Sequence, residues 1–219
     1  MPTIHLVRHA QASFGAADYD VLSDRGHAQA AALGRALTER GIAPDRVICG
    51  PARRHRDTAA GCPALRAAGV EVDERWDEYP ADEVLARHGD TPLRLAGPGA
   101  GQVGSAEFQD VLDRALRAWI AAGDEPWRAF VERVQGALTD LAGSLGRGER
   151  AVVVTSGGPI AAVCGLVLDA LEQTFVAFNR VQVNTGVTTL AVGGRGLSLV
   201  TVNEHGHLLR DGGGLVTYR

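Results

Sequence analysis

Lysine is absent from this 219-residue sequence, in which all 22 basic residues are arginine. The absence excludes Schiff-base catalysis by a lysine, and it excludes the phosphate-binding loop whose lysine reaches the phosphates of a nucleotide. The formal net charge is -4, so the overall field gives no reason to expect a nucleic acid or an anionic membrane as a partner. Any positively charged site in this chain has to be local.

Cysteines and long apolar segments are scarce. The three cysteines are far apart in the sequence, and an odd number without metal-type spacing argues against a disulfide framework and against a metal site. No run of about 18 apolar residues occurs, and the N-terminus lacks the basic start and apolar stretch of a signal peptide. We therefore expect a cytoplasmic protein with no membrane partner, no metal and no cofactor.

The composition is otherwise that of a globular protein. Hydrophobic residues make up 45% of the chain and charged residues 22%, which does not fit a disordered chain. The length allows one generous domain with a substantial core. We expect a single domain over residues 1–219.

Apolar runs alternate with segments of helical spacing. The runs cover residues 4–7, 47–49, 70–72 and 151–155, and helices are expected over residues 24–40, from Gly50-Pro51 toward Ala68, and from residue 157 to Leu171. Buried parallel strands have such uninterrupted apolar runs. Residues 188–192 and 197–202, joined by a glycine-rich turn, predict an antiparallel hairpin at the sheet edge. The pattern predicts an α/β fold, a three-layer α/β/α sandwich with a mostly parallel sheet.

The alternation weakens over residues 86–125. A loop at residues 97–101 is followed by helical spacing from Ser105 to Ile120. We expect a lid-like helical insertion between core strands that forms a substrate-selecting wall. A pair of helices that only packs on the core is the alternative interpretation.

The pair Arg8-His9 directly follows the first predicted strand. The chain contains two other Arg-His pairs, at residues 54–55 and 87–88, and neither follows a strand directly. Open α/β sheets build their ligand sites at the carboxyl ends of parallel strands. The position of Arg8-His9 therefore makes it the candidate functional pair.

Several motifs are spread along nearly the whole chain. The opening motifs are Leu6-Val7-Arg8-His9-Ala10, Leu22-Ser23-x-x-Gly26-x-x-Gln29-Ala30 and Leu33-Gly34. The later ones are Gly50-Pro51-x-x-Arg54-x-x-x-Thr58-Ala59, Trp76-Asp77-Glu78, the segment 152–160, and Asn203-Glu204-His205-Gly206-His207-Leu208. Together these motifs closely resemble those of the histidine phosphatase superfamily, the group that includes cofactor-dependent phosphoglycerate mutases. The resemblance implies a phosphoglycerate mutase-like fold.

The resemblance also implies a set of roles. His9 is expected to be the nucleophile that forms a phosphohistidine, and the planar guanidinium groups of Arg8 and Arg54 are expected to bind the phosphoryl group. Glu78 is expected to protonate the leaving alkoxide and then, as a carboxylate, to activate water. Asp77 and Glu74 are the alternatives for that acid.

Several positions depart from the family pattern. The late loop has Ser156 where the family places a second histidine, and losing one preorganised donor costs on the order of 10²–10³ in rate. Ser156 and Gly157 still predict an anion-binding turn. His205 or His207 could supply the lost imidazole by folding back, although edge-strand histidines are the preferred interpretation. Mutase-like members also carry Thr and Asn where this chain has Ala12 and Gly15.

The sequence favours a metal-independent phosphomonoester hydrolase that acts through a phosphohistidine on His9. The expected substrate is a phosphorylated small molecule of unspecified identity, and the oligomeric state is left open. A phosphoglycerate mutase-type phosphotransferase is one alternative. A catalytically silent phospho-ligand binder, in which Ser156 has abolished turnover, is the other.

Three further patterns favour weaker interpretations. Gly99-x-Gly101-x-x-Gly104 matches a dinucleotide-binding fingerprint but follows no strand. Thr155-Ser156-Gly157 suggests a nucleophile elbow, but a valine stands where the elbow needs glycine. The basic cluster at residues 53–56 is interpreted as Arg54 with solvated or substrate-steering neighbours.

Overall fold

The computed structural model describes residues 1–13, 20–91, 104–210 and 213–218. The strands are β1 (Thr3–Arg8), β2 (Arg46–Cys49), β3 (Glu71–Val72), β4 (Arg150–Thr155), β5 (Val187–Gly193) and β6 (Gly196–Glu204). The helices are α1 (Asp24–Glu39), α2 (Arg53–Gly61), α3 (Pro63–Arg66), α4 (Ala81–His88), α5 (Ser105–Ala122), α6 (Glu125–Ser144), α7 (Gly157–Val167) and α8 (Leu171–Val181), with 3-10 turns η1 (Glu74–Trp76) and η2 (Gly206–Leu208).

The six strands form one mixed sheet in the order β3-β2-β4-β1-β5-β6. The four strands from β3 to β1 run parallel to one another, β5 is antiparallel to β1, and β6 is antiparallel to β5. The mostly parallel sheet with an antiparallel hairpin at its C-terminal edge is therefore confirmed.

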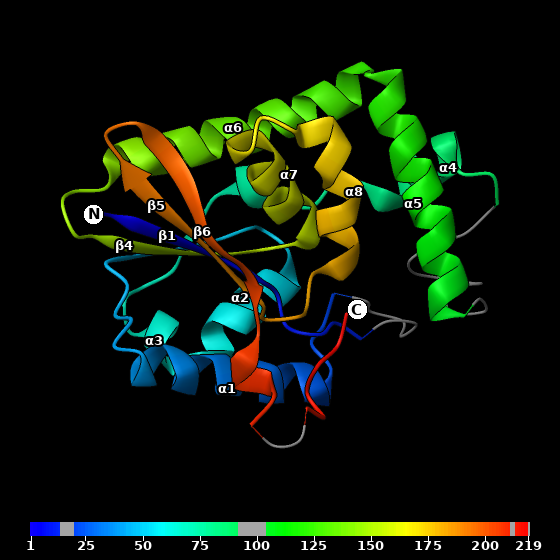
Figure 1. Ribbon diagram of the computed structural model, residues 1–219. Helices are drawn as coiled ribbons and strands as arrows, with labels where there is room; N and C mark the ends of the chain where they lie inside the picture. Colours follow the sequence, from blue (N-terminus) through cyan, green and yellow to red (C-terminus); the bar gives the residue numbers. More distant parts are fainter. Residues whose placement is uncertain (14–19, 92–103, 211–212, 219) are drawn as a thin grey trace.

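The apolar runs of the sequence are buried on both faces of the sheet. In β4, Val152 and Val154 pack with residues of α1, α2 and α3, whereas Ala151 and Val153 pack with residues of α5, α6, α7 and α8. Figure 1 shows α1, α2 and α3 on one side of the sheet and α6, α7 and α8 on the other. Alternate side chains of one strand thus enter two different cores, and the three-layer arrangement is confirmed.

Two predicted helices have different limits from those expected. The helix expected to run toward Ala68 is two helices, because Pro63 disfavours helical geometry at Cys62, which has an extended backbone with φ of -103° and ψ of 102°. The helix expected to reach Leu171 ends at Val167. Asp169 then adopts a left-handed φ of 51°, which turns the chain into α8.

Two long helices lie where the sequence pattern predicted none: α6 and α8. The start of α6 carries a recognisable signal, because Asp124 accepts the N–H of Trp127 at 3.2 Å as the N-cap, and a proline stands in the first turn. An N-cap residue followed by a proline thus marks the start of α6 in the sequence.

The insertion expected over residues 86–125 corresponds to α4, α5 and the residues between them. Figure 1 shows α4 and α5 beside the sheet rather than stacked on its centre. The helix predicted from Ser105 to Ile120 is present as α5, two residues longer. The loop at residues 97–101, Gly99 and Gly101 of the dinucleotide pattern, and Gly15 lie outside the described residues. The lid-like role of this insertion stays a prediction.

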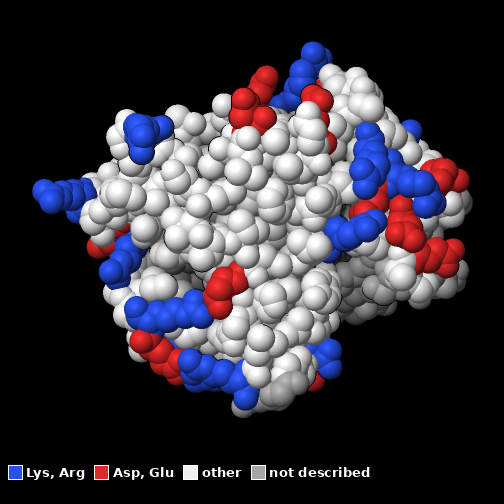
Figure 2. All heavy atoms as spheres, in the orientation of Figure 1, with Lys and Arg blue, Asp and Glu red and all other residues white. Residues whose placement is uncertain are grey.

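Charged side chains of both signs are mixed on the face of the molecule drawn in Figure 2. Several arginines of the protein are in ion pairs with acidic residues, among them Arg40 with Glu204 and Arg114 with Asp90. None of the helices that the structure describes combines the length and the apolar character needed to cross a bilayer.

Candidate functional site

The candidate site lies at the carboxyl ends of three neighbouring parallel strands. His9 follows β1, Ser156 follows β4, and Arg54 lies in the first turn of α2, which comes after β2. A cavity of about 650 Å³ opens at this edge of the sheet, where open α/β sheets bind ligands. Five of the six predicted site residues line the cavity: Arg8, His9, Arg54, Glu78 and Gly157. The sixth, Ser156, is fully buried behind its wall.

The side chain of His9 has a defined proton position. Its Nδ1 lies 2.7 Å from the carbonyl oxygen of Ala10. Because a carbonyl oxygen can only accept, Nδ1 carries the proton and Nε2 carries the lone pair of the neutral imidazole. Nε2 is therefore the atom of His9 that can attack an electrophile.

Burial and neighbouring positive charges keep His9 neutral. Burial lowers the pKa of His9 well below its usual value, and the nearby guanidinium groups of Arg54 and Arg8 lower it further. A neutral imidazole retains the lone pair that nucleophilic attack needs. The two arginines thus favour an anionic ligand and an unprotonated His9 at the same time.

Hydrogen bonds to the backbone on both sides of His9 fix its position. The N–H of His9 donates to the Thr155 carbonyl at 2.8 Å, and the N–H of Ala10 donates to Thr58 Oγ1 at 2.9 Å. The side chain of Asn184 donates to the His9 carbonyl at 3.0 Å. Thr58 belongs to a motif found in the sequence. Asn184 was not predicted, since nothing in its neighbourhood of the sequence marks it.

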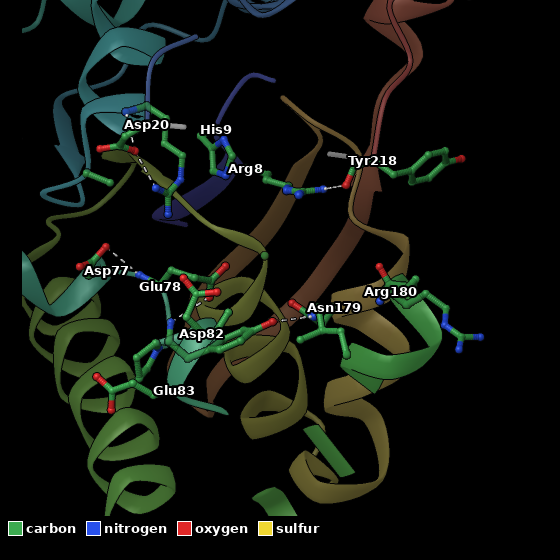
Figure 3. A pocket seen from close by; sticks show the side chains of 18 of the residues that line it. Arg8, His9, Asp20, Asp77, Glu78, Asp82, Glu83, Asn179, Arg180 and Tyr218 are labelled. Atoms are coloured by element: carbon green, nitrogen blue, oxygen red, sulfur yellow. Dashed lines mark hydrogen bonds and ion pairs between the residues drawn. The ribbon is translucent and has the colours of Figure 1, made fainter. Parts of the chain in front are cut away.

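Arg8 is held by residues from the C-terminal part of the chain. Its Nη1 donates to the backbone carbonyl of Tyr218 at 2.8 Å, as Figure 3 shows, and to the backbone carbonyl of Gln182. These residues are more than 170 positions away in the sequence, so no local pattern could have connected them to Arg8.

Arg54 forms an ion pair with Asp20 on the cavity wall. Arg54 Nη1 lies 2.6 Å from Asp20 Oδ1, and the N–H of Arg53 at the start of α2 donates to Asp20 Oδ2 at 2.6 Å. Guanidinium groups and helix N-termini are the donors that proteins use to bind phosphate. An internal carboxylate therefore already contacts donors suited to a phosphoryl group. Asp20 was not predicted from the sequence.

Glu78 lies on the wall of the same cavity, across from Arg8 and His9 in Figure 3. Its Oε1 accepts the N–H of Gly158 at 3.1 Å and the N–H of Tyr79 at 3.0 Å. Burial raises the pKa of Glu78, although the charge of Arg54 and these N–H groups oppose the shift. A carboxyl group with a raised pKa keeps its proton at a higher pH than an exposed glutamate, as a general acid must.

The loop that carries Glu78 is held from α6. Arg133 Nη1 donates to the backbone carbonyls of Arg75 at 2.8 Å and Asp77 at 2.9 Å, and Arg133 Nη2 donates to that of Glu78 at 3.4 Å. The guanidinium also lies 5.3 Å from the ring centre of Phe130. Arg133 thus fixes the acid-bearing loop without touching the cavity, and no sequence pattern indicated this role.

The two alternative acids are placed differently from Glu78. Asp77 lines the cavity, but its Oδ1 accepts the N–H of Glu78 at 2.9 Å and so supports that loop. Glu74 belongs to η1 and is not among the residues that line the cavity. The geometry favours Glu78.

An imidazole does lie beside His9, but it comes from α2. The ring of His55 is 5.6 Å from that of His9, centre to centre. His55 Nε2 lies 2.7 Å from Ser156 Oγ, and Arg54 Nη2 lies 3.3 Å from the same oxygen. In the sequence, His55 belongs to the Arg-His pair at residues 54–55 and to the basic cluster at residues 53–56, and neither pattern indicated a role for it.

The two C-terminal histidines do not line the cavity. His207 Nε2 lies 3.1 Å from Thr185 Oγ1, and His205 Nδ1 donates to the carbonyl of Asn203 at 2.7 Å. The alternative in which one of them folds back into the site is therefore not supported. The preferred interpretation as edge-strand histidines is close but inexact, because His205 follows the end of β6 and His207 lies in η2.

The outer part of the cavity is built by helices on both sides. Phe108 and Leu112 of α5 give it an apolar wall, and Asn179 of α8 contributes an amide whose nitrogen donates to Tyr79 Oη at 3.2 Å. Figure 3 shows Asp82 and Glu83 of α4 beneath Glu78. The cavity wall that was expected from residues 86–125 is thus formed in part by α5. The contribution of α8 to the same wall was not predicted.

Within the described ranges, no group of three His, Cys, Asp or Glu side chains is arranged to hold a metal ion. Arg8 and Arg54 bring positive charge to the cavity at the strand ends, and Asp20 brings a carboxylate beside Arg54.

Several solved structures share the fold of this chain. One is YhfR from Bacillus stearothermophilus, with 18% identity, a TM-score of 0.69, and coverage of 95% of this chain and 100% of that one. A second is a mycobacterial glucosyl-3-phosphoglycerate phosphatase, with 22% identity, a TM-score of 0.64, and coverage of 92% and 98%. A third is a phosphoserine phosphatase from Entamoeba histolytica, with 17% identity, a TM-score of 0.62, and coverage of 95% and 100%. These likenesses confirm the predicted phosphoglycerate mutase-like fold.

The sequence itself gives the family. No curated protein sequence matches the chain, but the family model described as the histidine phosphatase superfamily (branch 1) matches residues 4–205. The match includes all six residues predicted for the site. The chain belongs to the histidine phosphatase superfamily.

Proposed function

We propose that this protein is a metal-independent phosphomonoester hydrolase that works through a phosphohistidine on His9. The observation that carries the proposal is the arrangement of His9 and Glu78 in one cavity. Nε2 of His9 holds a lone pair because Nδ1 donates to the Ala10 carbonyl, and Glu78 is a partly buried acid with a raised pKa. A nucleophile and a proton donor are the two groups that the first step requires.

In the first step, Nε2 of His9 attacks phosphorus while the bond from phosphorus to the alkoxide oxygen breaks. Glu78 gives its proton to that oxygen, and the alcohol leaves. In the second step, the Glu78 carboxylate takes a proton from water, whose oxygen attacks phosphorus, and the bond between phosphorus and nitrogen breaks. His9 is neutral again, Glu78 is protonated again, and inorganic phosphate is released.

Arg8 and Arg54 would bind the phosphoryl oxygens during both steps. Their planar groups match the geometry of phosphate, and both residues line the cavity that His9 and Glu78 share. Positive charge at the equatorial oxygens is the main requirement of phosphoryl transfer. The backbone N–H of Gly157, at the start of α7, is a further donor for this anion.

The substrate would be a phosphorylated small molecule. A cavity of about 650 Å³ is of the size that proteins use for small ligands. Family membership supports this class, and so do the two fold relatives whose names state glucosyl-3-phosphoglycerate phosphatase and phosphoserine phosphatase.

A catalytically silent phospho-ligand binder is the second candidate. The burial of Ser156 behind the cavity wall favours it, because the loop after β4 then brings no charged side chain to a transition state that carries negative charge. The mutase-type transferase has no comparable observation in its favour. It would move phosphate between hydroxyl groups of one sugar acid with little release of inorganic phosphate.

The test is the release of phosphate from p-nitrophenyl phosphate in the presence of a chelator. We expect the parent protein to turn over and His9→Ala to be inactive, with His27→Ala, an exposed histidine of α1, as the matched control. Acid-labile phosphate on the parent, but not on His9→Ala, would identify the intermediate. Phosphate binding without any hydrolysis would instead favour the silent binder.

A further inference from the structure

The strongest unexplained feature of the site is a pair of fully buried polar side chains behind the cavity wall. His55 and Ser156 are both 0% exposed, and His55 Nε2 lies 2.7 Å from Ser156 Oγ. Neither residue lines the cavity, so neither touches a ligand there. A buried polar pair next to a catalytic residue needs a role or a structural reason.

The pair connects to the phosphate-binding arginine. Arg54 Nη2 lies 3.3 Å from Ser156 Oγ, and a guanidinium can only donate. The hydroxyl oxygen therefore accepts from Arg54, and its proton is available for His55 Nε2. Since Arg54 Nη1 also contacts Asp20 Oδ1 at 2.6 Å, the guanidinium is held from two directions.

His55 is suited to this contact in its neutral form. Burial lowers the pKa of His55 well below its usual value, and the charges of Arg54 and Arg56 lower it further. A neutral imidazole offers one nitrogen as an acceptor, which a hydroxyl proton can occupy. The third nearby titratable group, His9, is itself held neutral.

The absence of a side chain at Gly50 leaves space for the ring of His55. A Cβ atom at residue 50 would overlap the His55 ring and would lie 2.7 Å from the carbonyl oxygen of Trp76. The side chain of His55 in this position therefore requires glycine at residue 50. Ser156 stands where the family places a histidine, and His55 lies against both Ser156 and Gly50.

We infer that His55 is a positioning residue that acts on Arg54 through Ser156, and that Gly50, His55 and Ser156 form one packed unit. His55 fixes the Ser156 hydroxyl so that its oxygen faces Arg54, and Arg54 in turn presents its guanidinium to the phosphoryl group. The inference rests on the proposed function, because its effect is on phosphate binding and transfer. In this arrangement the neutral Ser156 contributes to phosphate binding indirectly, because its hydroxyl oxygen orients the positively charged Arg54.

The test compares His55→Ala, His55→Gln, Ser156→Ala and the double variant His55→Ala/Ser156→Ala. Two readouts are needed: the Kd for inorganic phosphate, measured by calorimetry, and kcat and KM for p-nitrophenyl phosphate. The glutamine amide can reach Ser156 Oγ where the imidazole does, so His55→Gln keeps the hydrogen bond. His27→Ala is the control for loss of a histidine.

We expect His55→Ala and Ser156→Ala each to weaken phosphate binding and to lower kcat/KM by about tenfold, the effect of one charge-assisted hydrogen bond. The double variant should be no worse than either single variant, because all three break the same chain of contacts. His55→Gln should stay within about threefold of the parent.

Three results would overturn the inference. His55→Ala could bind phosphate as well as the parent and lose only thermal stability, which would make His55 structural. His55→Gln could be as damaged as His55→Ala, or the losses could add in the double variant.

The binding series is independent of turnover, so a parent that binds phosphate but does not hydrolyse it would overturn the proposed hydrolase alone. A parent that does not bind phosphate would overturn both.

Discussion

The backbone N–H of Gly158, in the first turn of α7, donates a hydrogen bond to Glu78 Oε1 at 3.1 Å. This contact joins the loop after β4 to the acid that follows η1, although the two are 80 residues apart. It also requires glycine, since a Cβ atom at residue 158 would overlap Glu78 Oε1 and the ring of Tyr79. The backbone of residue 158 can thus approach the Glu78 carboxyl and orient it only because glycine has no side chain.

Gly158→Ala should therefore reduce catalysis more than stability. The added methyl group would push the Glu78 carboxyl away from its position, and misplacing a proton donor costs on the order of 10² in rate. The check is kcat for p-nitrophenyl phosphate together with urea unfolding. The matched control is Gly136→Ala in α6, where a Cβ atom meets nothing within 4 Å. This control should gain about 0.5–1 kcal/mol from the better helix former and keep its activity. Equal activity in the two alanine variants would contradict the assignment of Glu78.

Glu78→Gln separates the two steps of the proposed reaction. Glutamine keeps the acceptor for Gly158 but can neither give nor take a proton. With p-nitrophenyl phosphate, whose leaving group needs little protonation, the first step should continue while the water step slows by about 10²–10⁴. We expect phosphohistidine to accumulate, visible as a burst of nitrophenolate that matches the enzyme concentration. A linear time course with unchanged kcat would place the acid elsewhere, and Asp77→Asn is then the next variant.

The sequence predicted the parts of this site that are local in the chain. Arg8-His9 could be assigned because it directly follows a clear apolar strand, and parallel strands end at one edge of a sheet. Arg54 could be assigned because it lies in a motif that resembles the family's, Gly50-Pro51-x-x-Arg54. Their positions in the structure agree with that reasoning, and the roles themselves stay predictions until the variants are measured.

The contacts that hold these residues could not be predicted, because they join distant parts of the chain. Arg133 supports the loop of Glu78 from 55 residues away, and Asn184 bonds the His9 carbonyl from 175 residues away. Neither has a spacing that marks it. Ser156 was expected to face the phosphate, but burial against His55 places it behind Arg54, and only packing could reveal that.

Acidification should destabilise the folded protein. Burial lowers the pKa of His9 and of His55 well below the usual value and that of His207 to about 4. Below the usual histidine pKa of about 6.5, the unfolded chain therefore binds protons that the folded chain does not. The free energy of unfolding should fall as the pH decreases from about 6.5 toward 4, by up to about 1.4 kcal/mol per pH unit for each such histidine. The raised pKa of Glu78 acts in the opposite direction, but as one group against four histidines, because burial also lowers the pKa of His5.

Urea unfolding at several pH values between about 7.5 and 5 measures this slope. His207→Gln should make it shallower, because glutamine can still donate to Thr185 Oγ1 and has no proton to gain. The matched control is His27→Ala, which removes an exposed histidine and should leave the slope unchanged. A free energy of unfolding that increases toward low pH would show that these histidines are charged in the folded state.

Ser156→His, the change that would restore the family residue, should fail on its own. The Ser156 side chain is fully buried with its Oγ 2.7 Å from His55 Nε2, so a second imidazole has no space there. Overpacking of this kind typically costs about 1–3 kcal/mol, and the variant should unfold at lower urea concentration than the parent.

Adding His55→Ala to Ser156→His removes the obstructing ring. The double variant should therefore be more stable than Ser156→His alone, although each single change is destabilising. Ser156→His combined with His27→Ala should show no such recovery, since His27 is exposed on α1. If the effects of His55→Ala and Ser156→His were additive, the two side chains would not share one space, and the packed unit of Gly50, His55 and Ser156 would have to be abandoned.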